Sequence, residues 1–110
     1  MNAMKNTVQL IGNVGNDPEI KNLDGGKKVA NLTIATNDSY KNDKGEKVEQ
    51  TEWHKVVAWG KTAEIIEKFV TKGKEIAIEG KLTHRSYDDK NGEKRYITEV
   101  VANEVLLLGK

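Results

Sequence analysis

Both tryptophans of this chain lie in one short segment, Trp53 and Trp59, six positions apart. In an extended strand successive side chains alternate between two faces, so Trp53, Lys55 and Trp59 share one face and Val56 and Ala58 share the other. If the apolar face is buried, two flat rings point outward with a lysine between them. Such a surface suits a single-stranded nucleic acid, whose bases stack on rings while its phosphates meet cations. The segment alone is equally compatible with indoles in the core, because tryptophan is usually well buried.

The tyrosines extend this pattern. Tyr40 and Tyr87 each precede a polar hairpin loop, and each is followed five residues later by Gly-Glu-Lys, beginning at Gly45 and Gly92. Phe69 alone is predicted to lie on a buried helical face. The other five aromatic residues fall on strands or at loop edges: Tyr40, Trp53, Trp59, Tyr87 and Tyr96. A chain that leaves its core to aliphatic residues is expected to use these rings for contact.

The net charge and the arginine content indicate how such a surface could bind a nucleic acid. The chain has 18 Lys and Arg against 17 Asp and Glu, a net charge of +1, so any surface for a polyanion must come from local clustering. Arg85 and Arg95 are the only arginines. Because arginine is the usual reader of guanine edges, its scarcity favours contact with the backbone over sequence reading.

Length and composition indicate one globular domain, which we place at residues 4–108 of the 110, with residues 1–3 as an added leader before a natural start at Met4. The absence of cysteine excludes disulfides and thiolate metal sites. No apolar run approaches the ~20 residues that span a bilayer, and no secretory signal pattern opens the chain. A cytoplasmic protein without membrane contact is therefore expected.

Alternating apolar residues predict five strands, at residues 8–14, 30–36, the tryptophan segment, 76–82 and 94–108. Hairpin loops are expected at 42–45 and at 89–92, the second because Asn-Gly tolerates positive φ. Gly12 and Gly15 suggest bulges or sharp bends, as barrel corners require.

One helix is predicted at residues 62–72, with Thr62 as its N-cap and Gly73 just beyond its end. Ala63, Ile66, Phe69 and Val70 fall at helical spacing. Short strands with glycine corners favour a small β-barrel or sandwich. The position of the helix, between strands three and four, is typical of an all-β OB-fold, a five-stranded Greek-key barrel.

Several short segments stand out by their order and spacing: Gly12-Asn-Val-Gly15-Asn-Asp17-Pro18-Glu19, Val29-Ala-Asn-Leu-Thr-Ile-Ala35-Thr36, Gln50-Thr-Glu-Trp53-His54, Gly73 and Ile78-Glu79-Gly80-Lys81-Leu82. Through these segments the chain resembles bacterial single-stranded DNA-binding proteins over roughly residues 6–108. The resemblance implies an OB-fold that assembles as a homotetramer and wraps single-stranded DNA around its outside, in replication, recombination and repair.

The resemblance also implies site residues. Trp53 falls at a stacking tryptophan of the family and Trp59 at a position that is often phenylalanine. Tyr40 and Tyr87 replace tryptophans of the best-known members, so each offers a smaller stacking area. Four residues match cationic positions that follow phosphates: Lys55, Lys61, Lys72 and Arg85. His54 resembles the histidine at the subunit interface.

The sequence offers little support for catalysis, a metal or a cofactor. The two histidines lack a matching carboxylate or serine signature, and no close set of zinc ligands is visible. Two other interpretations stay open: an OB-fold primosome accessory protein, and a protein-interaction module. Family members usually continue into a flexible tail that recruits replication and repair proteins. No such tail follows Leu108 in the 110 residues, so these partners are expected only if the native chain has one.

Overall fold

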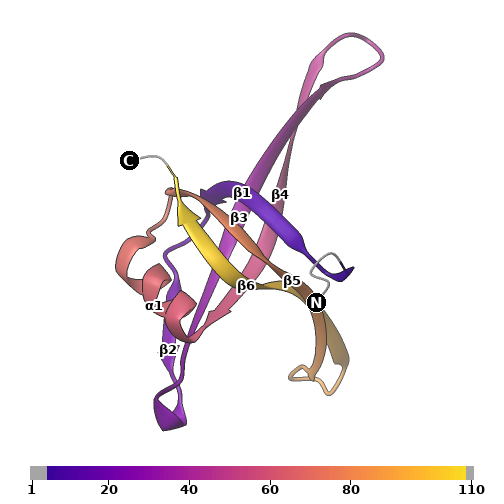
Figure 1. Cartoon of the computed structure of the whole chain (residues 1–110). Helices are drawn as coiled ribbons and strands as arrows, with labels where there is room; N and C mark the ends of the chain where they lie inside the picture. Colours follow the sequence, from indigo (N-terminus) through magenta and orange to yellow (C-terminus); the bar gives the residue numbers. More distant parts are fainter. Residues whose placement is uncertain (1–4, 109–110) are drawn as a thin grey trace.

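The computed structural model describes residues 5–108, and the expected leader at residues 1–3 lies outside this range. Six strands, one α-helix and a short 3₁₀ segment make up the described fold (Figure 1). In chain order they are β1 (Val8–Val14), β2 (Glu19–Asn22), η2 (Asp24–Gly26), β3 (Lys28–Lys41), β4 (Lys47–Trp59), α1 (Gly60–Phe69), β5 (Glu75–Asp88) and β6 (Lys94–Leu107).

Five of these strands close a barrel in the order β1-β5-β6-β4-β3, and a pairing of β1 with β3 completes the ring. All neighbours are antiparallel except β4 and β6, which pair in parallel over three residues of each strand. The helix lies between the third and fourth barrel strands, so the predicted OB-fold is confirmed. The short β2, which pairs with β3, was not predicted, because its four residues contain only one apolar side chain, Ile20.

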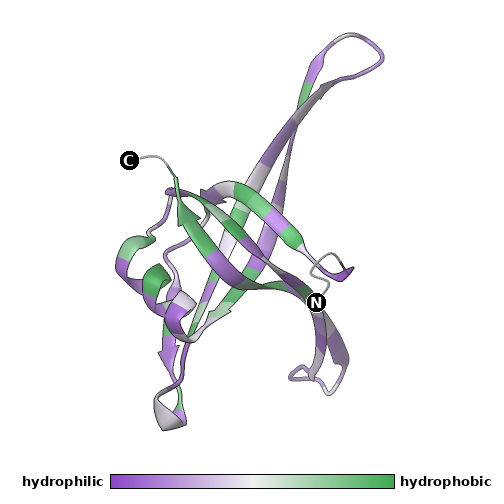
Figure 2. Cartoon of the chain, in the orientation of Figure 1, coloured by the Kyte–Doolittle hydropathy of each residue, from purple (hydrophilic) through white to green (hydrophobic). Residues whose placement is uncertain are grey.

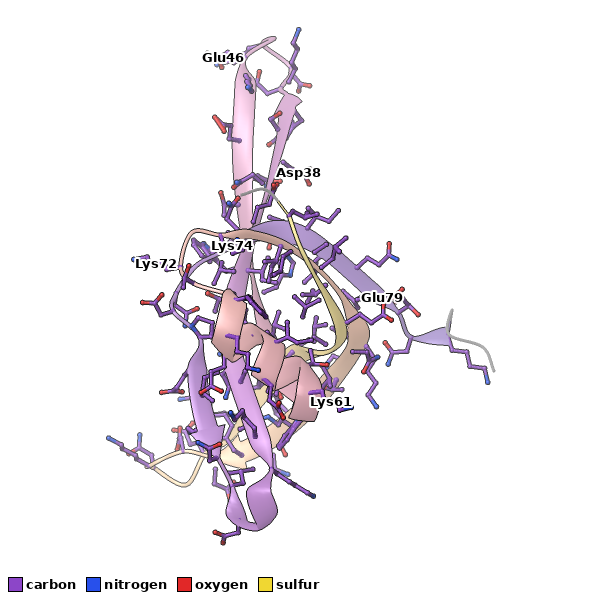
Figure 3. All side chains as sticks on the ribbon, turned by 60° about the vertical axis from the view of Figure 1, so that its left-hand side comes forward. Asp38, Glu46, Lys61, Lys72, Lys74 and Glu79 are labelled. Carbon is purple, nitrogen blue, oxygen red and sulfur yellow. The ribbon has the colours of Figure 1, made fainter. Side chains whose placement is uncertain are left out.

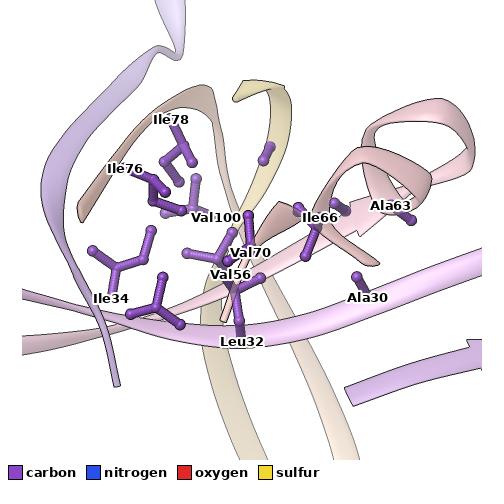
Figure 4. Packing of buried hydrophobic residues seen from close by; sticks show 13 residues of the cluster. Ala30, Leu32, Ile34, Val56, Ala63, Ile66, Val70, Ile76, Ile78 and Val100 are labelled. Carbon is purple, nitrogen blue, oxygen red and sulfur yellow. The ribbon is translucent and has the colours of Figure 1, made fainter. Parts of the chain in front are cut away.

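An aliphatic core fills the barrel (Figure 4). Ile34, Val56, Ile66 and Ile76 are its largest fully buried side chains. They come from β3, β4, α1 and β5, so the core joins most of the strands to the helix. Figure 2 shows that the parts of the strands that project beyond the barrel are mostly hydrophilic.

The helix differs from its prediction at both ends. It spans Gly60–Phe69, and Thr62 does not cap it; its hydroxyl donates instead to the carbonyl of Asn103 at 3.3 Å. The chain is already extended at Val70, so Gly73 is no helix terminator. It adopts a φ of 89° in the following turn, and its N–H donates to the carbonyl of Val14.

Phe69 was predicted in the core, and this prediction is wrong: the residue is 55% exposed. Ala63, Ile66 and Val70 fill the space under the helix, at spacings of three and four residues. Phe69, one position short of Val70, is turned away from that face. The chain therefore carries an exposed aromatic ring on α1.

The two long hairpins end in loops of the same design. Asn42 and Asp89 each accept two backbone N–H groups with Oδ1, and a glycine with a φ of 79°, Gly45 or Gly92, completes each turn. The hairpin loops predicted at 42–45 and 89–92 are therefore confirmed. Within residues 5–108 only glycines have positive φ, so in the second loop Gly92, and not Asn91, takes the left-handed conformation. The pattern is a three-residue loop with the glycine in the left-handed region.

A test of the barrel closure follows from Gly12, where β1 turns from β5 toward β3. A Cβ there would lie 2.2 Å from the carbonyl oxygen of Ala35, a backbone atom that cannot move without disturbing β3. We expect Gly12→Ala to lower the free energy of unfolding by about 1–3 kcal/mol in urea at a fixed protein concentration. The exposed Lys81→Ala serves as control and should change it by less than about 0.5 kcal/mol. Equal stability of both variants would contradict the tight approach.

Candidate nucleic-acid interface

The two tryptophans of β4 face outward. Trp53 is 63% exposed and Trp59 is 48% exposed, whereas Val56 and Ala58 between them are buried in the barrel. This confirms the outward arrangement of the rings and removes the alternative in which they form the core. The rise of a strand places the two indoles about 20 Å apart along β4, so they are two separate exposed rings on one face.

Trp53 lies directly against the backbone of the β1–β2 connection. A Cβ on Gly15 would be 2.4 Å from Cζ3 of the indole and 2.7 Å from the hydroxyl of Thr33. The connection is held in turn by Asn16, whose Oδ1 accepts the N–H and the hydroxyl of Thr33. One side of the ring therefore rests on a fixed backbone, and the residue remains largely exposed elsewhere.

Trp59 has a different setting at the other end of β4. It lines a cavity of about 500 Å³ together with η2 and the start of α1, and the lysines beside it are Lys27 and Lys28. Lys28 forms an ion pair with Glu67 of α1. Lys27, which was not among the predicted site residues, is exposed and brings a positive charge to this indole.

A polar groove of about 720 Å³ lies between these two rings. β4 and β6 pair only from Val56 to Ala58, so beyond Val56 the β3–β4 and β5–β6 hairpins diverge into two arms, as Figure 1 shows. Lys55 of one arm and Arg85 of the other both line the groove, together with Lys21 of β2. The structure thus brings together two predicted cations from distant parts of the sequence.

The other predicted residues are spread around this centre. Tyr40, 51% exposed, lies near the tip of the β3–β4 arm, and Tyr87, 45% exposed, lies on the β5–β6 arm. Lys61 lies in the first turn of α1, and Lys72 lies in the turn that follows the other end of the helix (Figure 3). The backbone N–H of Lys72 donates to Oδ1 of Asp17, which fixes the backbone at this position. The side chain of Lys72 remains exposed.

His54 occupies the opposite side of β4 from the indole row. It is half-buried, and its Nε2 is 2.9 Å from the hydroxyl of Thr36. Together with Leu82 and Tyr96 it lines a cavity of about 360 Å³ at the divergence of the arms. Tyr96 is the most exposed aromatic residue, at 76%, and was not among the predicted site residues.

Both arginines pair with carboxylates on the β5–β6 arm. Nε of Arg85 is 2.8 Å from Glu99, and Nε of Arg95 is 2.9 Å from Asp89. Hydrogen bonding to Glu99 raises the pKa of Arg85. The pKa of Asp89 is lowered, mainly by its hydrogen bond with Arg95 and then by the backbone N–H of Glu93. No signal in the sequence alone identifies these pairs, because they depend on strand register.

Residues 5–108 contain neither a metal-ion cluster nor a membrane-spanning helix. No group of three or more acidic or histidine side chains in this range is arranged to hold a metal ion. No helix in the same range has the length and apolar character needed to cross a membrane.

The strand order and the position of the helix define an OB-fold protein, and exposed aromatic rings lie on its surface. The model of the single-strand binding protein family matches residues 5–108, and the chain belongs to that family. It is 47% identical over 105 residues to single-stranded DNA-binding protein 1 of Chlorobaculum tepidum, covering 94% of this chain and 65% of the relative. It is also 47% identical to single-stranded DNA-binding protein 1 of Xylella fastidiosa, covering 98% of this chain and 80% of that protein.

A solved structure supports the same relationship. The Plasmodium falciparum SSB complex with single-stranded DNA superposes with a TM-score of 0.88 at 32% identity, covering 94% of this chain and 95% of that one. The chain spans about two thirds of the length of the Chlorobaculum relative and four fifths of the Xylella relative.

The contact between Gly15 and Trp53 can be tested in solution. In a Trp59→Phe background, Gly15→Ala should push the indole away from the backbone and increase quenching of Trp53 fluorescence by acrylamide. The accompanying loss of stability should be about 1–3 kcal/mol, as for other overpacked sites. Unchanged quenching in the folded variant would show that the ring does not rest on Gly15.

Proposed function

We propose that this protein binds single-stranded DNA without sequence preference and protects it during replication, recombination and repair, through one OB-fold domain at residues 4–108. The observation that carries the proposal is the pair of outward indoles on β4 with a groove between them that Lys55 and Arg85 line. Relatives named as single-stranded DNA-binding proteins, and a similar structure solved with such DNA, support it.

Binding combines stacking with charge neutralisation. Bases stack on four rings, Tyr40, Trp53, Trp59 and Tyr87, each contributing about 1–3 kcal/mol where a base is engaged. Phosphates meet four cations, Lys55, Lys61, Lys72 and Arg85, and release their counterions. Because every base has a π-face, this chemistry produces little sequence preference. It also involves no bond breaking, so we assign no enzymatic activity and no cofactor.

The positions of these residues imply that the DNA passes over several parts of the protein. Trp53 and Trp59 are too far apart to stack on neighbouring bases, and the two tyrosines lie on different arms. The groove with Lys55 and Arg85 lies where the two arms diverge. We therefore propose that the single-stranded DNA runs along the outer face of β4 and also contacts both arms.

We further propose that the protein is a homotetramer. Ile11, Ala77 and Leu106 are aligned across β1, β5 and β6, and Ile11 and Leu106 are more than 60% exposed. Such a row on the outside of a sheet is suited to burial against another copy. β1 pairs with β3 only at Asn13 and Val14, so most of one edge of β1 is free to pair with a second chain.

His54 is proposed to lie at a subunit interface, beside the exposed Leu82 and Tyr96. Recruitment of replication and repair proteins is proposed only for a native protein that carries a tail beyond Lys110.

The stacking role of Trp53 has a direct test. Trp53→Ala should weaken binding to oligo(dT) by more than about 1 kcal/mol, measured by fluorescence anisotropy of a labelled oligonucleotide. Phe69→Ala is a matched control, since Phe69 is similarly exposed but lies on α1 away from the groove. Equal affinities of wild type and Trp53→Ala, with the variant folded, would refute the role of this ring.

The assembly is tested by light scattering at micromolar concentration. Wild type should have about four times the 12.3 kDa mass of one chain. Ile11→Glu should reduce the mass because it places a charge in the apolar row, whereas Phe69→Glu on α1 should not. A monomeric wild type would exclude the tetramer, and a dimer would favour the primosome accessory alternative.

A further inference from the structure

The two arginines of the chain occupy equivalent settings on one face of the β5–β6 arm. Arg85 is opposite Ile97 in the ladder and pairs diagonally with Glu99, two residues further along β6. Arg95 is opposite Tyr87 and pairs diagonally with Asp89, two residues further along the chain and just beyond the end of β5. Tyr87 is a neighbour of both arginines in the ladder: Arg85 precedes it by two residues on the same face, and Arg95 is opposite it.

Both arginines are held in the same way. Within residues 5–108 each uses its Nε–H for the carboxylate, and no other hydrogen bond of either guanidinium is found there. A guanidinium has five N–H donors, so four on each arginine, all on the Nη nitrogens, stay available. Both side chains are 56% exposed. An Nη pair is the part of arginine that binds a phosphate with two hydrogen bonds.

Stability alone does not account for these pairs. Exposed ion pairs contribute little to folding. The side chain of Glu99 is only 10% exposed, and it lines the same groove as Lys55, where a carboxylate repels phosphate. Burial of a charge held by one ion pair is costly rather than favourable. If each carboxylate fixes the direction of an arginine side chain, this role explains why the carboxylate is present.

We propose that Arg95 binds the DNA backbone together with Arg85, on the face of the β5–β6 arm that also carries Tyr87, and that Asp89 and Glu99 are positioning residues that hold the two guanidinium groups toward the DNA. This inference rests on the proposed function and deepens it. Neither carboxylate touches DNA. Each reduces the side-chain freedom that its arginine would otherwise lose on binding.

The first experiment measures the salt dependence of binding to oligo(dT). Loss of one phosphate contact on a single strand should reduce the slope of log K against log salt concentration by about 0.7. Arg95→Ala should show this reduction and a two- to fivefold loss of affinity, about the size of an exposed ion contact. Lys94→Ala is the matched control, because it removes the same charge from the adjacent residue, whose side chain lies on the other face of the strand.

The second experiment separates positioning from net charge. Asp89→Asn keeps the turn, because Asn42 accepts the same two backbone N–H groups in the other hairpin with an amide oxygen. The change makes the protein more positive, so simple electrostatics predicts tighter binding. Positioning predicts weaker binding, measured at about 0.2 M salt, where distant charges are screened. It also predicts that Asp89→Asn adds nothing in an Arg95→Ala background.

The outcomes are distinguishable. Failure of wild type to bind oligo(dT) would overturn the proposed function itself. If wild type binds and Arg95→Ala matches either wild type or Lys94→Ala, Arg95 has no specific role. If Arg95→Ala is weaker but Asp89→Asn binds more tightly than wild type, Asp89 opposes binding and the positioning role is wrong.

Discussion

The short parallel contact between β4 and β6 determines the shape of the whole interface. Val56 to Ala58 of β4 pair with Val100 to Ala102 of β6, and this contact joins the two halves of the barrel. Longer pairing would close the space between the hairpins. Because it stops at Val56, the two arms diverge and leave a polar groove where Lys55 and Arg85 meet. The same residues that seal the core therefore begin the groove.

Placement of charge matters in this protein more than its amount. A net charge of +1 gives no general attraction for a polyanion. The positive groups are clustered: lysines lie beside each indole, and carboxylates hold the arginines on the β5–β6 arm. In the proposed binding mode, such a surface gives strong binding at low salt and ready release as salt rises, since the attraction depends on local phosphate contacts. In the same proposal, the rings supply the part of the binding that salt affects less.

The sequence predicted those features that depend on local pattern. Alternation correctly put Trp53 and Val56 on opposite faces of one strand, although it left open which face is buried, and the position of the helix indicated the barrel topology. It failed where a residue's surroundings come from elsewhere in the chain. Phe69 has a helical spacing that fits burial, but Val70 takes the place under the helix. β2 contains only one apolar residue, so its sequence pattern does not predict a strand. It forms because its backbone pairs with β3.

The site was partly predictable for the same reason. Exposure of the aromatic residues follows from alternation, whereas the meeting of Lys55 with Arg85 and the pairing of Arg95 with Asp89 require the register of β5 and β6. Tyr96, Lys21 and Lys27 carry no motif of their own, and only the fold places them beside Trp53 or Trp59 or in the groove.

The central claim is that the indoles of β4 stack on bases while the groove neutralises phosphates. Titration of the wild-type protein with oligo(dT), followed by intrinsic tryptophan fluorescence at low and high salt, tests it most directly. We expect strong quenching and an affinity that falls as salt rises. Absence of quenching at low salt would contradict stacking by Trp53 and Trp59 and would favour a surface that binds a protein partner.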